Sequence, residues 1–345
     1  MPQYFLLLSG EHPSLPFAEV EAILEAEKIP YRKRQKTRQV LRLNTTATAI
    51  EALKTRSAFT RVLCQELFCC KASTGEITNS IRSAPLEQFL SSGDSFAVRV
   101  RRIGKRTGGF TSVGLEKVVG GAILDKVKRT KVNLSSPEKV FFGTITSGYF
   151  VFGLKLAEVS PTPFRERRPR KKPFFHPSAM RAKLARCMVN LVKPIAGDLL
   201  LDPFCGTGSL LIEGGLIGCR VVGFDADKRM VKGSMRNLKF FNVECDGLAV
   251  ADVKNLPISK ANCIVTDPPY GRSASTMGYE TKEIIHDFLK TAIQSLDKGQ
   301  SICLAAPITS NIKLIAQKVG LTHVQSHLLY VHRSLTREIT VLEKS

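Results

Sequence analysis

From residue 178 onward, stretches typical of strands and of helices alternate along the chain, and this alternation constrains the fold more than any other feature. DLLLDPFCGTGSLLIEGGLIG (198–218) reads as a strand, a tight loop and a helix, and RVVGFDAD (220–227) supplies the next strand. Strands that alternate with helices form parallel sheets, because each helix returns the chain to the same edge. The sequence therefore predicts an α/β fold with a doubly wound parallel sheet in residues 176–345.

The loop after the first of these strands carries two glycines, Gly206 and Gly208. Glycines at this position let backbone N–H groups approach a ligand at the helix N-terminus. The third glycine of the dinucleotide fingerprint is missing, because Leu211 occupies its place. Asp202, at the end of the strand, would repel a pyrophosphate but suits a ligand that carries a sulfonium and an ammonium group. The loop therefore favours S-adenosylmethionine and disfavours an oxidoreductase with the same fold.

Two further acids are spaced as the next strand ends would be. Asp225 lies 23 residues beyond Asp202, near the distance at which an acid contacts ribose hydroxyls in doubly wound sheets. Asp252 is placed to accept from an adenine amino group, with Val253 beside the ring. Each acid alone also fits a solvated turn or a helix N-cap. Three acids that close successive strands of one sheet favour the cofactor site of a methyltransferase.

The stretch IVTDPPYG (264–271) reads as a strand that ends in a rigid turn. An exocyclic amino group of a nucleobase is a poor nucleophile, because its lone pair is delocalised into the ring. Asp267 and the carbonyl of Pro268 are suited to accept both of its N–H bonds, and Tyr270 offers a face for an extruded base. A purely structural turn is the alternative, since Asp-Pro and Pro-Pro are common turn formers. Beside the cofactor loop, the pattern favours an amino-methyltransferase.

The chain before this region divides by composition into further segments. Residues 1–58 read as a small α/β unit, and residues 59–157 as a second unit in which KVFFGTITSGYFVFGLKLAE forms a β-hairpin. Residues 158–175 are rich in proline and basic side chains and read as a linker to the methyltransferase domain at 176–345. The sequence thus predicts three domains and one linker.

The chain has a formal net charge of +21, and its basic excess is shared almost equally between residues 1–160 and 161–345. An excess on both sides of the linker predicts a polyanionic partner that touches more than one domain, although basic runs also occur on solvated faces. The candidates for phosphate contact lie in three basic runs: Arg32, Lys33, Arg34; Arg99, Arg101, Arg102, Lys105, Arg106; and Arg165, Arg167, Arg168, Arg170.

Neither a metal site nor a membrane span is expected. The 9 cysteines form no C-x-x-C pair, which argues against structural zinc and fits a reducing cytoplasm. No apolar run approaches the length of roughly 18 residues that a membrane helix needs. The first residues lack the basic region of a signal peptide. We therefore expect a cytoplasmic protein.

The motifs together resemble those of one known family. DPFCGTGSLLIEG, GFDAD, TDPPYG and the closing VHRSLTREITVL are similar to those of the archaeal tRNA guanine-N2-methyltransferases that act at position 10. Residues 59–157 resemble their THUMP domain, preceded by a ferredoxin-like unit, and residues 176–345 their class I methyltransferase domain of Rossmann-like fold. The resemblance implies a tRNA substrate, S-adenosylmethionine as cofactor, and N2-methylguanosine or N2,N2-dimethylguanosine as product. Some members work with a small zinc-binding activator subunit and others alone.

Two groups of site residues follow for this chain. FFHPSAMRAKLARCMVNL (174–191) precedes the first strand and, in this family, helps to cover the cofactor. The guanine amine is expected at Asp267, Pro268, Pro269 and Tyr270. The cofactor is expected at His176, Asp202, Pro203, Phe204, Gly206, Thr207, Gly208, Asp225, Ala226, Asp252 and Val253.

Other functions remain open at this point. The same chemistry serves for an rRNA guanine or a DNA adenine, although the THUMP-like region disfavours DNA. A noncatalytic RNA-binding protein that keeps a vestigial cofactor fold is a different class of alternative. The intact Asp267 and glycine loop argue against it, because a relic would be free to lose either.

Overall fold

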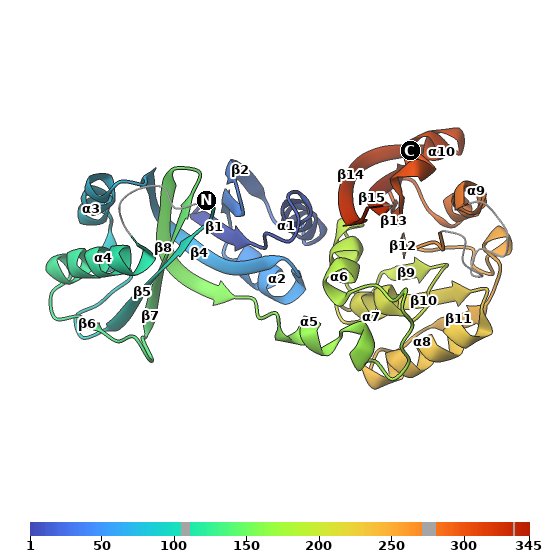
Figure 1. The fold of residues 1–345 in the computed structure, drawn as a ribbon, viewed down its shortest axis with the longest axis horizontal. Coiled ribbons are helices and arrows are strands. Elements are labelled where there is room, and N and C mark those ends of the chain that lie inside the picture. The colour runs from blue at the N-terminus through green and yellow to red at the C-terminus, as the bar shows by residue number, and fades with distance from the viewer. Residues whose placement is uncertain (105–110, 271–280, 334) are drawn as a thin grey trace. The chain divides into compact units, whose positions relative to one another are not determined.

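The computed structural model describes residues 1–104, 111–270, 281–333 and 335–345 (Figure 1). The chain divides into two compact units. Unit 1 comprises Met1–Phe17, Lys28–Thr55 and Phe59–Ser160, and unit 2 comprises Ala18–Glu27, Arg56–Ala58 and Pro161–Ser345.

Unit 1 is built on a sheet of 8 strands in the described part of the chain. The strands are β1 (Gln3–Leu8), β2 (Tyr31–Thr37), β3 (Val40–Thr45), β4 (Thr60–Lys71), β5 (Ser95–Arg102), β6 (Lys131–Val132), β7 (Lys139–Thr146) and β8 (Tyr149–Glu158), in the order β2-β3-β1-β4-β8-β7-β5-β6. β1 pairs antiparallel with both β3 and β4, and β4 pairs antiparallel with β8. Residues 1–58 and 59–157 therefore contribute to one continuous sheet.

Helices cover the sheet of unit 1. The helices in this part of the chain are α1 (Leu15–Ala26), α2 (Thr48–Arg56), α3 (Thr74–Ser83), the short 3-10 turn η1 (Leu86–Gln88) and α4 (Ser112–Lys126); most of α1 is assigned to unit 2. Ile77 of α3 and Leu115 of α4 are buried with Phe96, Phe141 and Phe150 of the strands. These contacts place α3 and α4 on one face of the sheet (Figure 1).

The hairpin predicted in KVFFGTITSGYFVFGLKLAE is confirmed as β7 and β8, which pair antiparallel. Ser147 has a φ of 49° and Gly148 a φ of 80°, so two successive residues adopt the left-handed conformation. Such turns match the twist of the two strands that they join.

Unit 2 contains the predicted doubly wound sheet. Its strands are β9 (Leu199–Asp202), β10 (Arg220–Asp225), β11 (Gly247–Val250), β12 (Cys263–Thr266), β13 (Ser301–Pro307), β14 (Leu321–His332) and β15 (Leu335–Lys344), in the order β11-β10-β9-β12-β13-β15-β14. The first five run parallel, whereas β15 pairs antiparallel with both β13 and β14. The antiparallel hairpin expected near the end of the chain is thus present.

Helices pack on both faces of this sheet. They are α5 (Thr162–Glu166), η2 (Pro169–Lys171), α6 (Ala182–Leu191), α7 (Ser209–Gly215), α8 (Lys228–Phe240), η3 (Val253–Asn255), α9 (Thr281–Ala292), η5 (Ile293–Ser295), η6 (Ile308–Ser310) and α10 (Ile312–Lys318). Leu201 and Ile264 are buried with Phe288 of α9 on one face. On the other face, a Cβ at Gly223 would lie 2.5 Å from Leu211 of α7. With both faces covered, the strand ends are the place where a ligand can meet the sheet.

In the residues that the structure describes, no helix combines the length and apolar character needed to cross a membrane. The same residues contain no group of three or more His, Cys, Asp or Glu side chains that could hold a metal ion.

Candidate active site

Three of the predicted acids meet at the carboxyl edge of the unit 2 sheet. Asp202 is the last residue of β9, Asp225 is the last residue of β10, and Asp267 directly follows β12. β9 pairs in parallel with both β10 and β12, so the three strand ends are neighbours. The chain winds in opposite directions on the two sides of this point, which is where ligands bind in folds of this type.

Asp202 is a buried acid, with 1% of its surface exposed. Its Oδ1 accepts a hydrogen bond from Thr266 Oγ1 at 2.7 Å and another from the Phe204 N–H at 3.2 Å. Burial raises the pKa of Asp202 to about 8, with smaller contributions in the same direction from Asp225 and Asp267. Within the described residues no basic side chain bonds to this carboxyl. A buried carboxyl without a cation is suited to bind one.

Asp225 holds the glycine loop (206–208) in place. Its Oδ2 accepts from the Gly206 N–H at 2.9 Å, and its Oδ1 accepts from the Asp227 N–H at 2.9 Å. Gly208 has a φ of 75°, and a Cβ there would lie 2.4 Å from Ser234 Oγ. Both the backbone conformation and the close approach of α8 therefore require glycine at this position.

The segment before α6 is fastened to this loop. The Phe174 N–H donates to Asn237 Oδ1 at 2.9 Å, and Asn237 Nδ2 donates to the Phe174 carbonyl at 3.0 Å and to the Thr207 carbonyl at 2.9 Å. The Phe174 ring lies where a Cβ at Gly233 would be, 2.0 Å from its nearest atom. One asparagine thus links the segment at residue 174 to the loop and to α8.

The other residues predicted for the cofactor lie around this centre. His176 is partly exposed, and its Nδ1 lies 2.7 Å from Ser178 Oγ. Asp252 is exposed and caps η3 by accepting from the Lys254 N–H at 3.0 Å, while Val253 packs against the buried core. Pro203 and Thr207 are buried in the loop, Phe204 packs on Phe288 with ring centroids 5.6 Å apart, and Ala226 is exposed.

Asp267 has a basic partner from the last strand. Arg337 of β15 donates through Nη2 to Asp267 Oδ1, and its guanidinium carbon lies 5.3 Å from the centroid of the Tyr270 ring. Burial raises the pKa of Asp267, and Arg337 opposes that shift. Pro268 is buried, and Pro269 and Tyr270 are partly buried. One arginine therefore contacts both the carboxylate and the aromatic ring of D-P-P-Y.

Comparisons with known proteins identify the families of the two matched domains and of the whole chain. The RMKL-like methyltransferase domain family, UPF0020, matches residues 169–339, and the THUMP domain family matches residues 71–151. The tRNA (guanine(10)-N2)-dimethyltransferase of Methanothermobacter thermautotrophicus is 36% identical over 344 residues, which are 99% of each chain. That of Methanocaldococcus jannaschii is 31% identical and covers 98% of this chain and 99% of its own.

The chain belongs to the tRNA (guanine(10)-N2)-dimethyltransferase family. Among solved structures, TrmN from Thermus thermophilus matches 99% of this chain and 100% of its own with a TM-score of 0.57 and 20% identity. SMU.472, a methyltransferase solved with S-adenosylhomocysteine, matches with a TM-score of 0.54 and 15% identity. These likenesses show the fold, which is the THUMP-containing sheet followed by a class I methyltransferase domain that the sequence predicted.

Two basic side chains of the linker (158–175), Arg167 and Lys172, are bonded inside the protein instead of facing solvent. Arg167 donates from Nε to Glu213 Oε1 at 2.6 Å and from Nη2 to Oε2 at 3.1 Å, and Arg186 lies 2.9 Å from the same carboxylate. Glu213 is 1% exposed. Lys172 is buried and donates to Ser209 Oγ at 2.7 Å. We assign Arg167 a structural role in place of the expected RNA contact, while Arg165, Arg168 and Arg170 are exposed.

The other basic candidates lie in unit 1. Arg32, Lys33 and Arg34 are exposed on β2, an edge strand of the sheet. Arg101 is exposed on β5, Arg102 is partly exposed, and Arg99 is partly buried with Nη2 donating to the Leu134 carbonyl at 2.7 Å. Lys105 and Arg106 lie outside the described residues.

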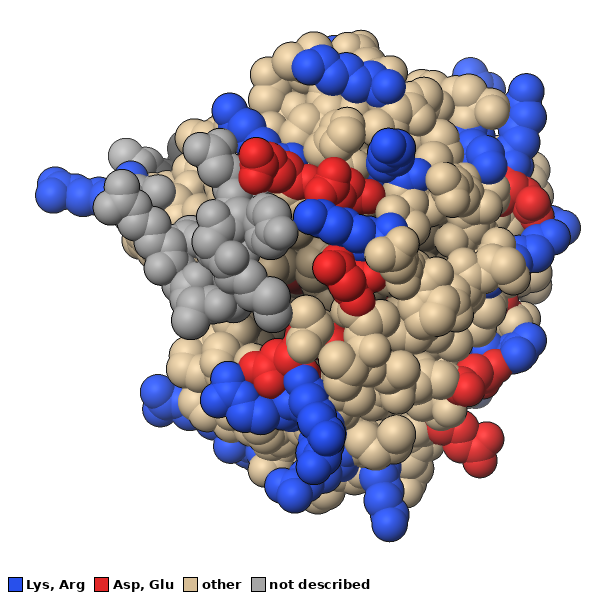
Figure 2. Space-filling model, turned by 90° about the vertical axis from the view of Figure 1, so that its right-hand side faces the viewer, with Lys and Arg blue, Asp and Glu red and all other residues tan. Residues whose placement is uncertain are grey.

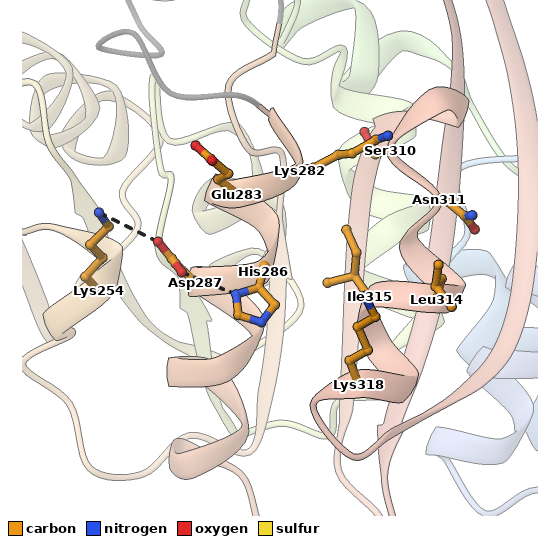
Figure 3. A pocket seen from close by; sticks show the side chains of 10 residues that line it. All are labelled: Lys254, Lys282, Glu283, His286, Asp287, Ser310, Asn311, Leu314, Ile315 and Lys318. Carbon is orange, nitrogen blue, oxygen red and sulfur yellow. Dashed lines mark hydrogen bonds and ion pairs between the residues drawn. The ribbon is translucent and has the colours of Figure 1, made fainter.

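A separate pocket of about 560 Å³ opens between α9 and α10 (Figure 3). His286 and Asp287 of α9 line one wall, Leu314 and Lys318 of α10 line the other, and Lys254 lies beside Asp287 at 3.7 Å. None of the residues predicted for the cofactor or the guanine lines it. We therefore place the candidate active site at the strand ends and not in this pocket.

Sequence reasoning missed Arg337, although the segment VHRSLTREITVL was singled out. Ile339 and Val341 follow it at intervals of two in a strand, so all three share one face. Both apolar residues are buried, and Arg337 is 9% exposed. A charged residue on the buried face of a strand requires a partner of opposite charge, and this was the signal.

Proposed function

We propose that the protein uses S-adenosylmethionine to methylate the N2 amino group of guanine 10 in tRNA. The observation that carries this proposal is the position of Asp267 at the end of β12, next to the strand end that bears the buried Asp202, in a chain of the tRNA (guanine(10)-N2)-dimethyltransferase family. Because the names of the archaeal relatives specify a dimethyltransferase, we propose two successive methylations that give N2,N2-dimethylguanosine.

The residues at the glycine loop fit the cofactor. The buried Asp202 has no basic partner among the described residues and suits the cationic end of the molecule. Asp225 is available to ribose hydroxyls, and Asp252 with Val253 to the adenine ring. His176, Pro203, Phe204, Gly206, Thr207, Gly208 and Ala226 complete this proposed site. When bound, the cofactor supplies an electrophilic methyl group on a positively charged sulfur.

Asp267 and the Pro268 carbonyl would prepare the amine. When each accepts one N–H of the guanine amino group, the nitrogen becomes pyramidal and its lone pair is freed from the ring. Pro268 holds its carbonyl without further ordering, because the ring fixes φ and the residue is buried. Transfer would form the nitrogen–carbon bond as the bond from that carbon to sulfur breaks, with S-adenosylhomocysteine as the leaving group. Positive charge would then develop on the nitrogen, where the Asp267 carboxylate would stabilise it. The surplus proton then leaves to Asp267 or to water.

Tyr270 would receive the guanine after it leaves the stack of the tRNA. The Arg337 guanidinium lies over the ring of Tyr270 at 5.3 Å. An aromatic face contributes roughly 1–3 kcal/mol per stacked base, which offsets part of the cost of extruding the base. Pro269, which is partly buried, keeps the ring at a fixed distance from Asp267.

We further propose that exposed and partly buried cations of both units bind the tRNA backbone. Those in unit 1 are Arg32, Lys33, Arg34, Arg99, Arg101 and Arg102, and those of the linker are Arg165, Arg168 and Arg170. On the face drawn in Figure 2, basic side chains are mixed with acidic ones, so the net charge does not form one continuous basic patch there. Each phosphate contact adds to the salt dependence of binding but carries little base information.

The first experiment is methyl transfer from labelled S-adenosylmethionine to unmodified tRNA transcripts, followed by nucleoside analysis. We expect labelled N2-methylguanosine and N2,N2-dimethylguanosine, both lost when guanine 10 is replaced by adenine. Labelled N6-methyladenosine in place of these products would refute guanine as the substrate. Activity that requires an added zinc-binding protein would show that the chain works with an activator subunit.

The role of Asp267 is tested with Asp267→Ala in the same assay. We expect the variant to lose methylation while it keeps its affinity for tRNA and for S-adenosylhomocysteine. Asp246→Ala is the control for the loss of an ion pair away from the site, because Asp246 pairs with Arg220, an exposed arginine at the start of β10. Wild-type turnover by Asp267→Ala would contradict the amine-holding role.

A further inference from the structure

Strand β15, the last strand in the sequence, carries one charged side chain, Arg337, that lies at the candidate active site. β15 runs antiparallel to β13, and Arg337 lies opposite Pro307, the last residue of β13. This register brings a residue near the start of β15 to the carboxyl edge, where the parallel strands end. Arg337 is 9% exposed, and its neighbours on the same face, Ile339 and Val341, are buried.

The guanidinium of Arg337 is divided between two partners. Nη2 donates to Asp267 Oδ1, and the guanidinium carbon lies over the Tyr270 ring, 5.3 Å from its centroid. Nε is buried and has no hydrogen-bond partner among the described residues. Burying a guanidinium is costly unless it is paired, so the pairing with Asp267 is required wherever this side chain is buried.

We propose that Arg337 is the positioning residue of the guanine site, which keeps Asp267 ionised and oriented and fixes the ring of Tyr270. The inference rests on the proposed function, because Asp267 and Tyr270 are the groups expected to hold the base. Arg337 occupies one oxygen of Asp267 and leaves the other for the amino group. It also occupies one face of Tyr270 and leaves the opposite face for stacking. The unpartnered Nε–H adds a donor for an acceptor atom of the base.

Arginine is suited to this task where lysine is not. Its planar fork can bond a carboxylate and stack on an aromatic ring at the same time, whereas an ammonium group is a compact point charge. Arg337→Lys therefore keeps the charge beside Asp267 but loses the contact with Tyr270. Arg337→Met keeps much of the volume and loses both.

The charge of Arg337 also determines when Asp267 is ionised. Among the described residues, the charged or titratable groups that face Asp267 are Arg337 from β15, Asp202 from β9 and Tyr270 of its own segment. Burial raises the pKa of Asp267, and Arg337 lowers it. Activity that needs the carboxylate is lost as the pH falls through this pKa. Without the arginine the pKa is higher, so the loss begins at a higher pH.

The test compares Arg337→Met and Arg337→Lys with the wild type. Arg220→Met is the control, because Arg220 donates from Nε to Asp246 at 2.7 Å at the opposite edge of the same sheet. The readouts are thermal unfolding, affinity for S-adenosylhomocysteine and for tRNA, and the pH profile of kcat at saturating tRNA. A fifth readout follows the carboxyl group of Asp267 directly. Its 13C carboxyl resonance is identified by its absence in Asp267→Asn, and its chemical shift is measured against pH in each protein.

We expect Arg337→Met to fold and to bind S-adenosylhomocysteine as the wild type does. Its kcat should fall about 10²-fold, the order of loss that follows when a catalytic group is displaced by about 1 Å from its productive position. Its acidic limb and the Asp267 resonance should both move to higher pH. Arg337→Lys should keep the wild-type titration of Asp267 and recover only part of the lost kcat, and Arg220→Met should match the wild type in every readout.

An Asp267 titration that is unchanged in a folded Arg337→Met protein would overturn the inference. So would an equal loss of kcat in Arg220→Met, which would point to a general effect on the sheet. A different result would refute the proposed function, namely wild-type protein that does not methylate guanine 10. In that case the titration of the Asp267 carboxyl would still decide whether Arg337 controls its ionisation.

Discussion

Binding of S-adenosylmethionine should release a proton, because Asp202 is largely neutral without a ligand. Burial raises the pKa of this acid to about 8, well above its ordinary value of 3.8. With that pKa, about one-tenth of the protein carries an ionised Asp202 at pH 7. A ligand with a sulfonium and an ammonium group binds the ionised form preferentially, so it must displace the proton from the rest.

The size of the effect follows from this ionised fraction. Between pH 6 and pH 7 the population of ionised Asp202 rises about ten-fold, and the affinity for a cationic ligand should rise by about the same factor. At pH 7 binding should release about 0.9 protons per site. The ligand's own ammonium group stays charged in this range, so the proton comes from the protein.

Calorimetric titrations in buffers of different ionisation enthalpy measure both quantities. Neutral 5′-methylthioadenosine, which lacks the sulfonium and the ammonium group, is the control ligand and should bind without proton release. Asp202→Asn is the control variant and should bind S-adenosylmethionine weakly and without pH dependence. An affinity for S-adenosylmethionine that is constant from pH 6 to pH 7, with no proton released, would refute the argument.

Two further predictions concern the linker. Glu213→Gln should lower the free energy of unfolding by about 3–5 kcal/mol, because Arg167 and the buried Arg186 then lose the carboxylate that they share. Urea unfolding measures this change, with Glu166→Gln as the control. Glu166 is exposed, so its substitution should lower the free energy of unfolding by less than about 1 kcal/mol. Equal losses in the two variants would contradict a stabilising role for the buried Glu213. For tRNA binding, Arg168→Ala should reduce the slope of the logarithm of the binding constant against the logarithm of the salt concentration by about 1. Arg167→Ala should leave that slope unchanged. Filter binding at several salt concentrations measures the slope for each variant.

Features encoded within a few residues could be predicted from the sequence. The glycine loop and the D-P-P-Y turn combine residues of special backbone geometry with an acid at a strand end. The ends of parallel strands meet at one edge, so spacing was enough to predict that Asp202 and Asp225 lie at neighbouring strand ends. Asp252, predicted by the same spacing, lies beyond the end of β11 and caps η3. The parallel sheet followed from alternation for the same reason.

Contacts between distant segments could not be predicted in this way. Asp267 and Arg337 are 70 residues apart, and only the register of β15 on β13 brings them together. The linker showed a related limit: a run of basic residues without regular structure does not reveal which of them turns inward. Arg167 faces the buried Glu213, while Arg168 next to it is exposed.

The continuous sheet of unit 1 bears on how a THUMP module can be moved between proteins. The matched segment, residues 71–151, contains only the last residue of β4 and the first three of β8. Excised at those limits, it would keep only the Lys71–Tyr149 pair of the β4–β8 ladder and three of the six β7–β8 pairs. A strand edge with unpaired N–H and C=O groups can pair with another chain and so promotes aggregation. A graft into another enzyme, or a gene fusion that transfers RNA binding, should therefore carry the chain from the start of β1 to the end of β8.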